Sequence, residues 1–144
     1  MEDTMAITDL IIEGVETAGP SATVEALAMR MAEAGVGSII IEENMKPVGI
    51  VTDRDIATRV DARDTTASSA TARDIMTSDP VTVTNDAGLL EVTNAMAEAS
   101  VRRLPIVNDN GTLVGIITLD DVMLLLATEL SNLGGVIQAE SPPY

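Results

Sequence analysis

The hydrophobic positions in the second half of the chain change their spacing along the sequence. Leu89, Val92 and Met96 recur at helical intervals, which predicts a helix that Asp86 caps and that ends near Ala99. Two apolar runs then predict strands around a polar hairpin turn, and a second helix follows; these elements are residues 104–107, the turn 108–111, residues 113–118 and a helix from Leu119.

The first half of the chain repeats this order of elements. We expect a helix capped by Ser21 that ends near Ala34, and then two strands, their turn and a second helix: residues 38–41 and 48–51, the turn 43–46 and a helix from Asp53. The segment Met31–Ala34 returns unchanged as Met96–Ala99. Shared segments at a nearly constant offset indicate two copies of one supersecondary unit. The copies fold against each other because neither can bury its apolar face alone.

These repeats divide the chain into four parts. Repeat 1, a small polar linker, repeat 2 and a tail are expected at residues 7–60, 61–72, 73–128 and 129–144. The last helix is apolar on nearly all sides, which predicts that it is buried at a subunit interface. The segment after Gly134 and Gly135 is expected to be loose.

Composition narrows the possible functions. The 144 residues contain no cysteine and no histidine, which excludes disulfides, the usual zinc sites, thiol nucleophiles and imidazole acid-base chemistry. We therefore do not expect an enzyme. The net charge of −15 repels phosphate backbones, so nucleic acid is not an expected partner. Since no apolar run approaches the roughly 20 residues that cross a bilayer, we expect a cytoplasmic protein without membrane contact.

The acidity also suggests where the protein works. An excess of acidic residues with Lys46 as the only lysine is typical of proteins from extreme halophiles. Dissolved salt screens the self-repulsion that would otherwise destabilise the compact state. We therefore expect stability to fall as salt is removed. A melting temperature that is constant from tenths of molar to several molar salt would contradict this.

Two related segments combine the end of a strand with the start of a helix. They are Gly49–Asp55 and Gly115–Asp121, and in each a threonine lies three residues before the final aspartate. At such a turn both side chains can reach the exposed amides of the helix, where they could also hold the vicinal hydroxyls of a ribose. A capping box that serves only the helix explains the same spacing equally well.

The chain resembles a pair of CBS domains, the regulatory module that binds adenine nucleotides and related adenosyl compounds. The resemblance covers about residues 7–126 and is carried by the two Gly-h-h-Thr-x-x-Asp segments, by Asp74–Val83 and by Val101–Val107. It implies an α+β fold: two tandem β-α-β-β-α CBS repeats packed with pseudo-twofold symmetry into one module. It also implies a stand-alone chain that forms a homodimer through its helices.

The resemblance further implies a ligand site between the repeats. The threonine and aspartate of each motif would hold ribose, and the chain from Met76 to Val81 would border an adenine. The expected ligand-binding residues are Thr52, Arg54, Asp55, Met76, Pro80, Val81, Arg102, Arg103, Ile116, Thr118 and Asp121. No catalytic or metal-binding residue is expected, and no cofactor is required.

The first copy departs from this pattern in three places. Its head, residues 10–17, lacks the Met-Thr and Pro of the second copy. Gly37–Ser38 stands where the second copy has Arg102–Arg103, and Ile40 stands where it has Pro105. We therefore expect two clefts of unequal affinity. The favoured one is expected to carry Met76, Arg103, Thr118 and Asp121.

The few arginines decide which ligand fits. Arg54, Arg102 and Arg103 could clamp a phosphate, which would make the ligand AMP, ADP or ATP. They could instead offset surface acid, for instance by a pair of Arg54 with Asp53 or Asp61. In that case a neutral or cationic ligand, S-adenosylmethionine or methylthioadenosine, would fit better.

The expected function is that of a small-molecule-sensing regulatory module. It would bind an adenosyl ligand between the repeats and transmit this to an unknown regulated protein. The alternative is a ligand-free dimerisation or scaffold module, in which the threonine and aspartate pairs are helix caps and nothing else.

Overall fold

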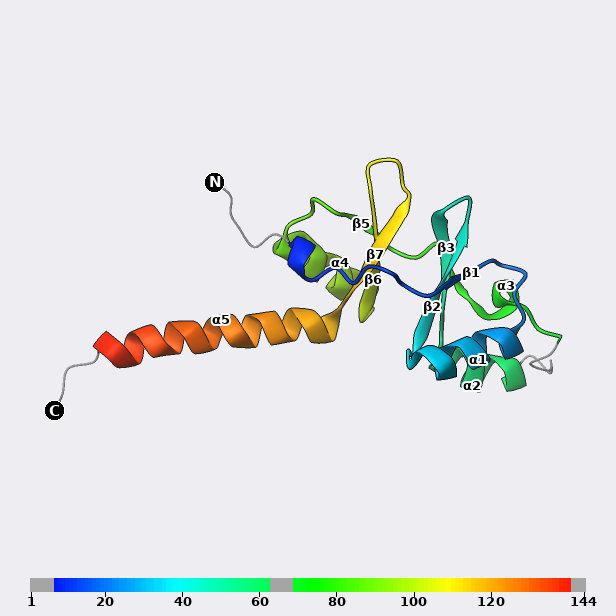
Figure 1. The fold of residues 1–144 in the computed structure, drawn as a ribbon, viewed down its shortest axis with the longest axis horizontal. Helices are drawn as coiled ribbons and strands as arrows, with labels where there is room; N and C mark the ends of the chain where they lie inside the picture. Colours follow the sequence, from blue (N-terminus) through cyan, green and yellow to red (C-terminus); the bar gives the residue numbers. More distant parts are fainter. Residues whose placement is uncertain (1–6, 63–68, 141–144) are drawn as a thin grey trace.

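The computed structural model describes residues 7–62 and 69–140 of the chain. Its elements are η1 (Ile7–Asp9), β1 (Thr17–Ala18), α1 (Val24–Ala34), β2 (Ser38–Glu43), β3 (Lys46–Thr52), α2 (Asp53–Ala62), α3 (Ala72–Ile75), β4 (Thr77–Ser78), β5 (Val83–Thr84), α4 (Leu89–Ala99), β6 (Arg103–Val107), β7 (Leu113–Thr118) and α5 (Leu119–Glu140). Figure 1 shows two halves side by side, with α5 projecting away from both. The predicted α+β fold of two strand-helix-strand-strand-helix units is confirmed. The middle of the expected linker, residues 63–68, lies outside the described residues.

Each half has a sheet of its own. The strand orders are β1-β2-β3-β4 and β5-β6-β7. In both sheets a short first strand runs parallel to the next strand, and an antiparallel hairpin follows. Parallel neighbours need a long crossover connection, which α1 provides in the first sheet and α4 in the second.

Two helix starts differ from the sequence prediction. The cap of α1 is Thr23 and not Ser21, since the Thr23 hydroxyl accepts a hydrogen bond of 3.1 Å from the amide three residues later. Helix α4 begins after Gly88 and not at Asp86. The Asp86 carboxylate instead accepts a hydrogen bond from the Thr84 hydroxyl, so it belongs to the preceding turn.

The first hairpin is also longer than predicted. Strand β2 extends to Glu43 and β3 begins at Lys46, so the turn has two residues where four were expected. Asn44 and Met45 have φ angles of 55° and 67°, the left-handed conformation that such tight turns need. Methionine is not a usual turn residue, which is why the pattern ended the strands too early.

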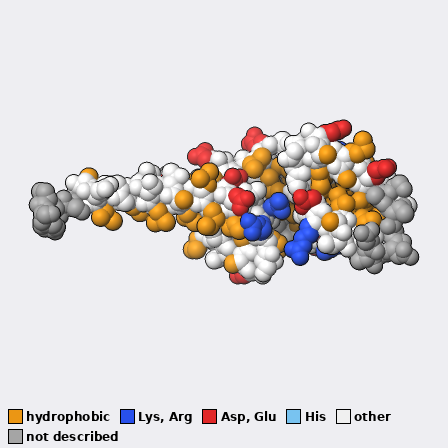
Figure 2. Space-filling view, turned by 90° about the horizontal axis from the view of Figure 1, so that it is seen from below, with side chains coloured by type: hydrophobic (Ala, Val, Ile, Leu, Met, Phe, Trp, Pro, Cys, Tyr) orange, Lys and Arg blue, Asp and Glu red, His pale blue; other side chains and the backbone are white. Residues whose placement is uncertain are grey.

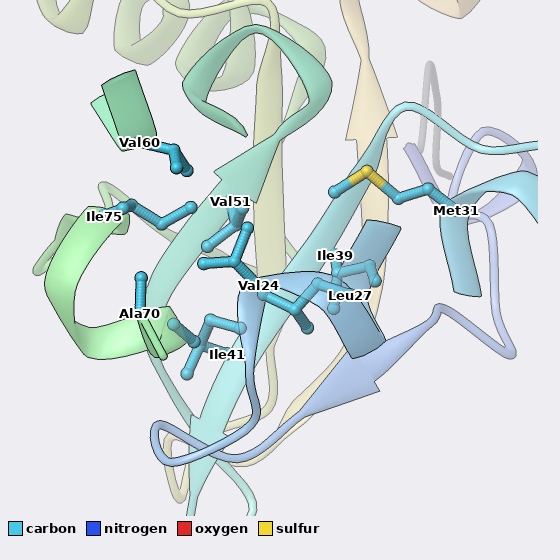
Figure 3. Packing of buried hydrophobic residues seen from close by; sticks show 10 residues of the cluster. Val24, Leu27, Met31, Ile39, Ile41, Val51, Val60, Ala70 and Ile75 are labelled. Carbon is cyan, nitrogen blue, oxygen red and sulfur yellow. The ribbon is translucent and has the colours of Figure 1, made fainter. Parts of the chain in front are cut away.

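The first core lies between the first sheet and the helices that cover it. Ile39 and Ile41, alternate residues of β2, face Val24 and Leu27 of α1 (Figure 3). All four side chains have no exposed surface (0%). Burying each aliphatic side chain of this size contributes about 1.5–3 kcal/mol to folding.

The second core repeats this arrangement, and further residues are buried between the halves. Leu104 and Ile106 of β6 pack in one cluster with Val92 of α4. Ile40 and Ile116 belong to neither core, yet they are buried as well. Strand alternation puts them on the sheet faces away from their own helices, and therefore toward the other repeat.

A short segment from each repeat crosses to the sheet of the other. Ile12, near the start of the first repeat, exchanges two backbone hydrogen bonds of 2.9 and 3.1 Å with Ile116 of β7. In the opposite direction, β4 of the second repeat pairs with β3 of the first. The exchange joins the two halves and puts the head of each copy beside the motif of the other.

The first glycine of each Gly-h-h-Thr-x-x-Asp motif permits this crossing. A Cβ atom on Gly115 would lie 2.8 Å from the backbone oxygen of Ile12, and one on Gly49 would lie 2.3 Å from the Met76 sulfur. Carbon atoms do not approach other groups so closely, so a side chain at Gly115 would have to displace the Ile12 backbone and one at Gly49 would have to displace the Met76 side chain.

Matching hydrogen bonds support the pseudo-twofold relation of the repeats. The Asp53 amide, at the start of α2, donates to the Gly37 carbonyl at 3.0 Å. The Leu119 amide, at the start of α5, donates to the Arg102 carbonyl at 2.8 Å. Each bond ties the end of the hairpin to the loop before it, and so fixes the motif at the strand-to-helix turn.

Helix α5 differs from the prediction in one respect. It continues through Gly134 and Gly135 to Glu140, where a loose segment was expected. Every residue from Leu126 to Ala139 is exposed in the single chain, and the burial of this helix at a subunit interface stays a prediction. An 18-residue window within residues 119–139 reaches a mean hydropathy of 1.4, so by length and composition alone this helix is also long and apolar enough to cross a membrane. The core helices of soluble proteins meet the same criteria.

Candidate functional site

A cleft of about 450 Å³ opens between the two repeats, a size usual for small-molecule sites. The first repeat contributes the end of β3 and the start of α2, and the second contributes the chain after β4 and before β6. We call it the arginine cleft; its lining residues are Ile50, Thr52, Asp53, Arg54, Asp55, Thr77, Asp79, Pro80, Val81, Ala99, Ser100, Val101, Arg102 and Arg103.

Thr52 and Asp55 form a capping box at the start of α2. The Asp55 carboxylate accepts a hydrogen bond of 2.9 Å from the Thr52 amide, and the Thr52 hydroxyl accepts one of 3.1 Å from the Asp55 amide. The other carboxylate oxygen of Asp55 lies 3.5 Å from Arg59 Nε. Both hydrogen bonds of a capping box are therefore formed, and that the motif serves the helix alone stays a prediction. The capping box is compatible with ligand binding, because each carboxylate oxygen can accept two hydrogen bonds.

Two arginines in the cleft have no acidic partner among the side chains that the structure describes. Within residues 7–60 and 69–139, no carboxylate lies within 4.0 Å of the guanidinium group of Arg54 or Arg103. The expected pair of Arg54 with Asp53 is therefore not formed, and the side chain of Asp61 lies outside the described residues. Both guanidinium groups are available to an anionic ligand.

The third arginine is engaged, but weakly. Arg102 lies 3.3 Å from the Asp120 carboxylate, and both side chains are mostly exposed. Exposed pairs of this kind contribute about 0–1 kcal/mol, so a ligand could replace Asp120 at little cost. Figure 2 shows that basic side chains gather in the middle of one face of the molecule, with acidic side chains beside them.

A second cleft of about 340 Å³ lies next to the motif of the second repeat. We call it the acidic cleft; its lining residues are Asp9, Leu10, Ile11, Ile12, Asp121, Leu124, Leu125 and Thr128. Among the described residues, its charged lining groups are the carboxylates of Asp9 and Asp121, and no lysine or arginine lines it. The Thr118 hydroxyl accepts a hydrogen bond of 3.2 Å from the Asp121 amide. These charges disfavour a phosphate-bearing ligand.

The residues of the favoured site do not meet in one cleft, so this prediction was wrong. Arg103 lines the arginine cleft, whereas Asp121 lines the acidic cleft with Thr118 behind it. The Met76 side chain packs over Gly49 against the first core. The prediction assumed that each motif is used with the head of its own copy, but the heads cross to the other sheet.

The arginine cleft nevertheless gathers most of the predicted residues: Thr52, Arg54, Asp55, Pro80, Val81, Arg102 and Arg103. Ile116 lies outside it, buried at the bridge to Ile12.

Sequence reasoning missed several lining residues. Ile50 and Val101 form apolar walls, and Asp79 follows β4 with a φ angle of 51°. Strand alternation could have identified Ile50, since its neighbour Val51 faces the first core. The residue type predicts the backbone conformation of Asp79 only weakly, because aspartate tolerates a left-handed backbone but does not require it.

The comparisons with known proteins agree with this architecture. The CBS domain family matches residues 7–62 and 72–128 of the chain. An uncharacterized protein of Methanopyrus kandleri, MK0525, is 39% identical over 110 residues, which are 76% of this chain and 56% of that protein. The chain thus spans only about half the length of this relative.

Solved structures show the same fold. The CBS domain pair of protein MJ0100, solved with 5′-methylthioadenosine and S-adenosyl-L-methionine, is 26% identical with a TM-score of 0.75, over 86% of this chain and 97% of that one. The CBS domain protein PAE2072 of Pyrobaculum aerophilum, complexed with AMP, is 26% identical with a TM-score of 0.73, over 85% and 98% of the two chains. The fold, the duplicated motif and the family match together show that this chain belongs to the CBS domain family and carries a pair of CBS domains.

Proposed function

We propose that the chain is a regulatory module that binds an adenine nucleotide, AMP, ADP or ATP, in the arginine cleft. Ligand binding there reports to a regulated protein through the relative position of the two repeats. Similar CBS pairs were solved with AMP and with S-adenosyl compounds, which supports an adenosyl ligand as the class.

One observation carries the choice of a phosphate-bearing ligand. Arg54 from the first repeat, together with Arg102 and Arg103 from the second, lines one cleft. Three of the chain's eight Lys and Arg residues line this cleft, and with Asp53, Asp55 and Asp79 they make it formally neutral within a chain of net charge −15. Charge-assisted hydrogen bonds from arginine are the usual means of holding phosphate.

The remaining walls suit a nucleoside. Asp55 and Thr52 lie at the helix start, where the carboxylate can accept hydrogen bonds from ribose hydroxyls. Ile50, Val81 and Val101 supply apolar surface for a purine. The chain has no Phe or Trp, so the base would pack against aliphatic groups.

A regulatory role follows from where the cleft lies. Its two sides belong to different repeats, so a ligand that contacts both stabilises one relative position of the halves over others. In the predicted homodimer such a change would alter the shape presented to a partner protein.

Titration calorimetry on the full chain in several molar KCl tests this proposal. AMP, ADP, ATP, S-adenosylmethionine and methylthioadenosine are titrated in turn. We expect saturable binding of at least one nucleotide, at one molecule per chain, and weaker binding of both S-adenosyl-type ligands. Tighter binding of S-adenosylmethionine or methylthioadenosine than of every nucleotide would contradict the phosphate assignment.

A ligand-free scaffold is the second candidate. The complete capping box of Thr52 and Asp55 favours it, because the motif already has a structural role. The same titrations separate the two functions. A scaffold predicts no heat of binding for any of the five ligands in protein that circular dichroism shows to be folded.

A further inference from the structure

One arginine behind the arginine cleft contacts both of its walls without lining it. Arg59 lies in the last turn of α2, four residues after Asp55. Its Nε atom lies 3.5 Å from a carboxylate oxygen of Asp55. Its Nη1 atom donates hydrogen bonds of 3.0 and 3.4 Å to the carbonyls of Ile75 and Met76. Arg59 therefore joins the motif of the first repeat to the head of the second.

The two carbonyls lie at the end of α3, just before the segment that borders the cleft. The last carbonyls of a helix have no partner inside it, so a side chain that donates to them fixes the helix end. From there the chain runs through β4, which pairs with β3, to residues 79–81, which line the arginine cleft. The position of this wall thus depends on where Arg59 holds the end of α3.

The contact with Asp55 fixes the direction of its carboxylate. One oxygen accepts the hydrogen bond from the Thr52 amide, and the other faces the Arg59 guanidinium. Only 15% of the Asp55 side chain is exposed, so water competes little for these two oxygens. Each oxygen can still accept one more hydrogen bond, which leaves two acceptors in fixed directions for a pair of hydroxyls.

The second copy lacks this arrangement. Four residues after the aspartate of its motif it has Leu125, where the first copy has Arg59. Among the side chains that the structure describes, Asp121 has no lysine or arginine partner. Between the described residues Thr118 and Asp121, only the hydrogen bond from the Asp121 amide to the Thr118 hydroxyl is formed. The carboxylate with an arginine behind it completes its capping box, and the carboxylate without one does not.

We propose that Arg59 is a positioning residue of the nucleotide site and sets the ribose wall and the base wall of the arginine cleft with one side chain. Its contact with Asp55 directs the carboxylate at the ribose, and its bonds to the end of α3 hold the segment that borders the base. This role rests on the proposed function, because it determines how the same cleft selects its ligand. It makes the cleft selective for ribonucleotides, since a deoxyribose lacks the 2′-hydroxyl that would donate to Asp55.

The affinities for AMP and 2′-deoxy-AMP test this role, by titration calorimetry on the full chain in several molar KCl. Wild-type protein should prefer AMP about tenfold, because the deoxy compound loses a hydrogen bond to a charged group. Arg59→Leu introduces the residue of the second copy. It should weaken AMP binding about tenfold and 2′-deoxy-AMP binding only about twofold, which reduces the preference to about twofold. Arg59→Gln keeps a polar side chain on α2 without the charge, and should reduce the preference to the same extent.

The matched control is Arg30→Leu. It removes another arginine of the first repeat, whose side chain is equally exposed and whose pair with Glu16 does not line the cleft. This variant should change neither affinity. Far-ultraviolet circular dichroism is recorded for each variant to show that it is folded.

The possible results separate this role from the proposed function. Wild-type protein that binds neither nucleotide would overturn the proposed function and this role with it. Wild-type protein that binds AMP, with Arg59 variants that keep both affinities or weaken both nucleotides equally, would overturn only the positioning role, because a merely structural arginine does not change the preference. In the Asp55→Asn background, Arg59→Leu should leave the preference unchanged, since the carboxylate on which it acts is gone; a further fall in preference there would also overturn the role.

Discussion

The arginine cleft and the acidic cleft are built around copies of one motif, but they differ in charge: three arginines balance three aspartates in the first, and two aspartates stand alone among the charged lining residues described for the second. In the first, Thr52 and Asp55 face Arg102 and Arg103, which come from the other repeat. In the second, Asp121 faces apolar residues and one further carboxylate. The two clefts share the motif but not the charge, because the residues opposite the motif come from the other repeat in each cleft.

This difference explains how a duplicated module can acquire one specialised site. The loop before the hairpin carries Arg102 and Arg103 in the second copy, but Gly37 and Ser38 in the first. Because the second loop lines the cleft of the first motif, the substitutions in one repeat change the charge of the cleft of the other. A comparison of repeats along the sequence alone assigns such changes to the wrong cleft.

Substitution of the glycines beside the crossing segments should produce the largest difference between the repeats in the free energy of unfolding. Gly115→Ala would bring a Cβ within 2.8 Å of the rigid backbone of Ile12, and we expect a loss of about 3 kcal/mol in the free energy of unfolding. Gly49→Ala mainly meets the flexible end of the Met76 side chain, and should cost about 1 kcal/mol. Urea unfolding at fixed high salt measures both values. Equal losses would contradict the crossing geometry.

Removal of a cleft arginine should have the next largest effect. Arg103→Ala is expected to weaken AMP binding by about 2 kcal/mol, or roughly 30-fold, because it removes a charged hydrogen-bond donor that lacks another partner. Ser38→Ala, at the matching position of the first repeat, is the control and should leave the affinity unchanged. Calorimetric titration of both variants checks the pair. An equal response would show that the arginine does not contact the ligand.

The two aspartates allow a sharper comparison of the clefts. Asp55→Asn keeps an acceptor for the helix cap but loses the charge, and should weaken AMP binding about tenfold. Asp121→Asn makes the same change in the acidic cleft and should alter AMP affinity less than twofold. If Asp121→Asn has the larger effect in the same titrations, the nucleotide lies in the acidic cleft.

The smallest effect is expected for Arg102. This side chain is already paired with Asp120 on an exposed surface. Arg102→Ala should therefore reduce AMP affinity by less than about 1 kcal/mol, or fivefold. A loss as large as that of Arg103→Ala, in parallel calorimetric titrations, would mean that Arg102 leaves Asp120 and binds the phosphate directly.

Much of the fold could be predicted from the sequence because its signals are local. The strand Leu113–Thr118 and the helix starts at Asp53 and Leu119 agree with the structure, since apolar runs and the Thr-x-x-Asp spacing specify them directly. The caps of α1 and α4 were misplaced, because several polar residues near each start could serve as caps and only tertiary contacts select one.

The site residues were predictable as a set, but their grouping was not. The duplicated motif pointed to Thr52 and Asp55, and the scarcity of positive charge pointed to the arginines. Which copy supplies which wall depends on the pairing of β4 with β3 and of Ile12 with Ile116, and these contacts are made between distant parts of the chain. The projection of α5 away from the body of the protein could not be predicted either, because periodicity shows an apolar face but not what covers it.

A crystal structure of the chain grown with saturating AMP tests the central claim most directly. We predict density for one nucleotide in the arginine cleft, with its phosphate at Arg54 and Arg103 and its ribose hydroxyls at Asp55. The acidic cleft beside Asp121 should contain no nucleotide. Density for AMP in the acidic cleft, or in neither cleft, would contradict the account.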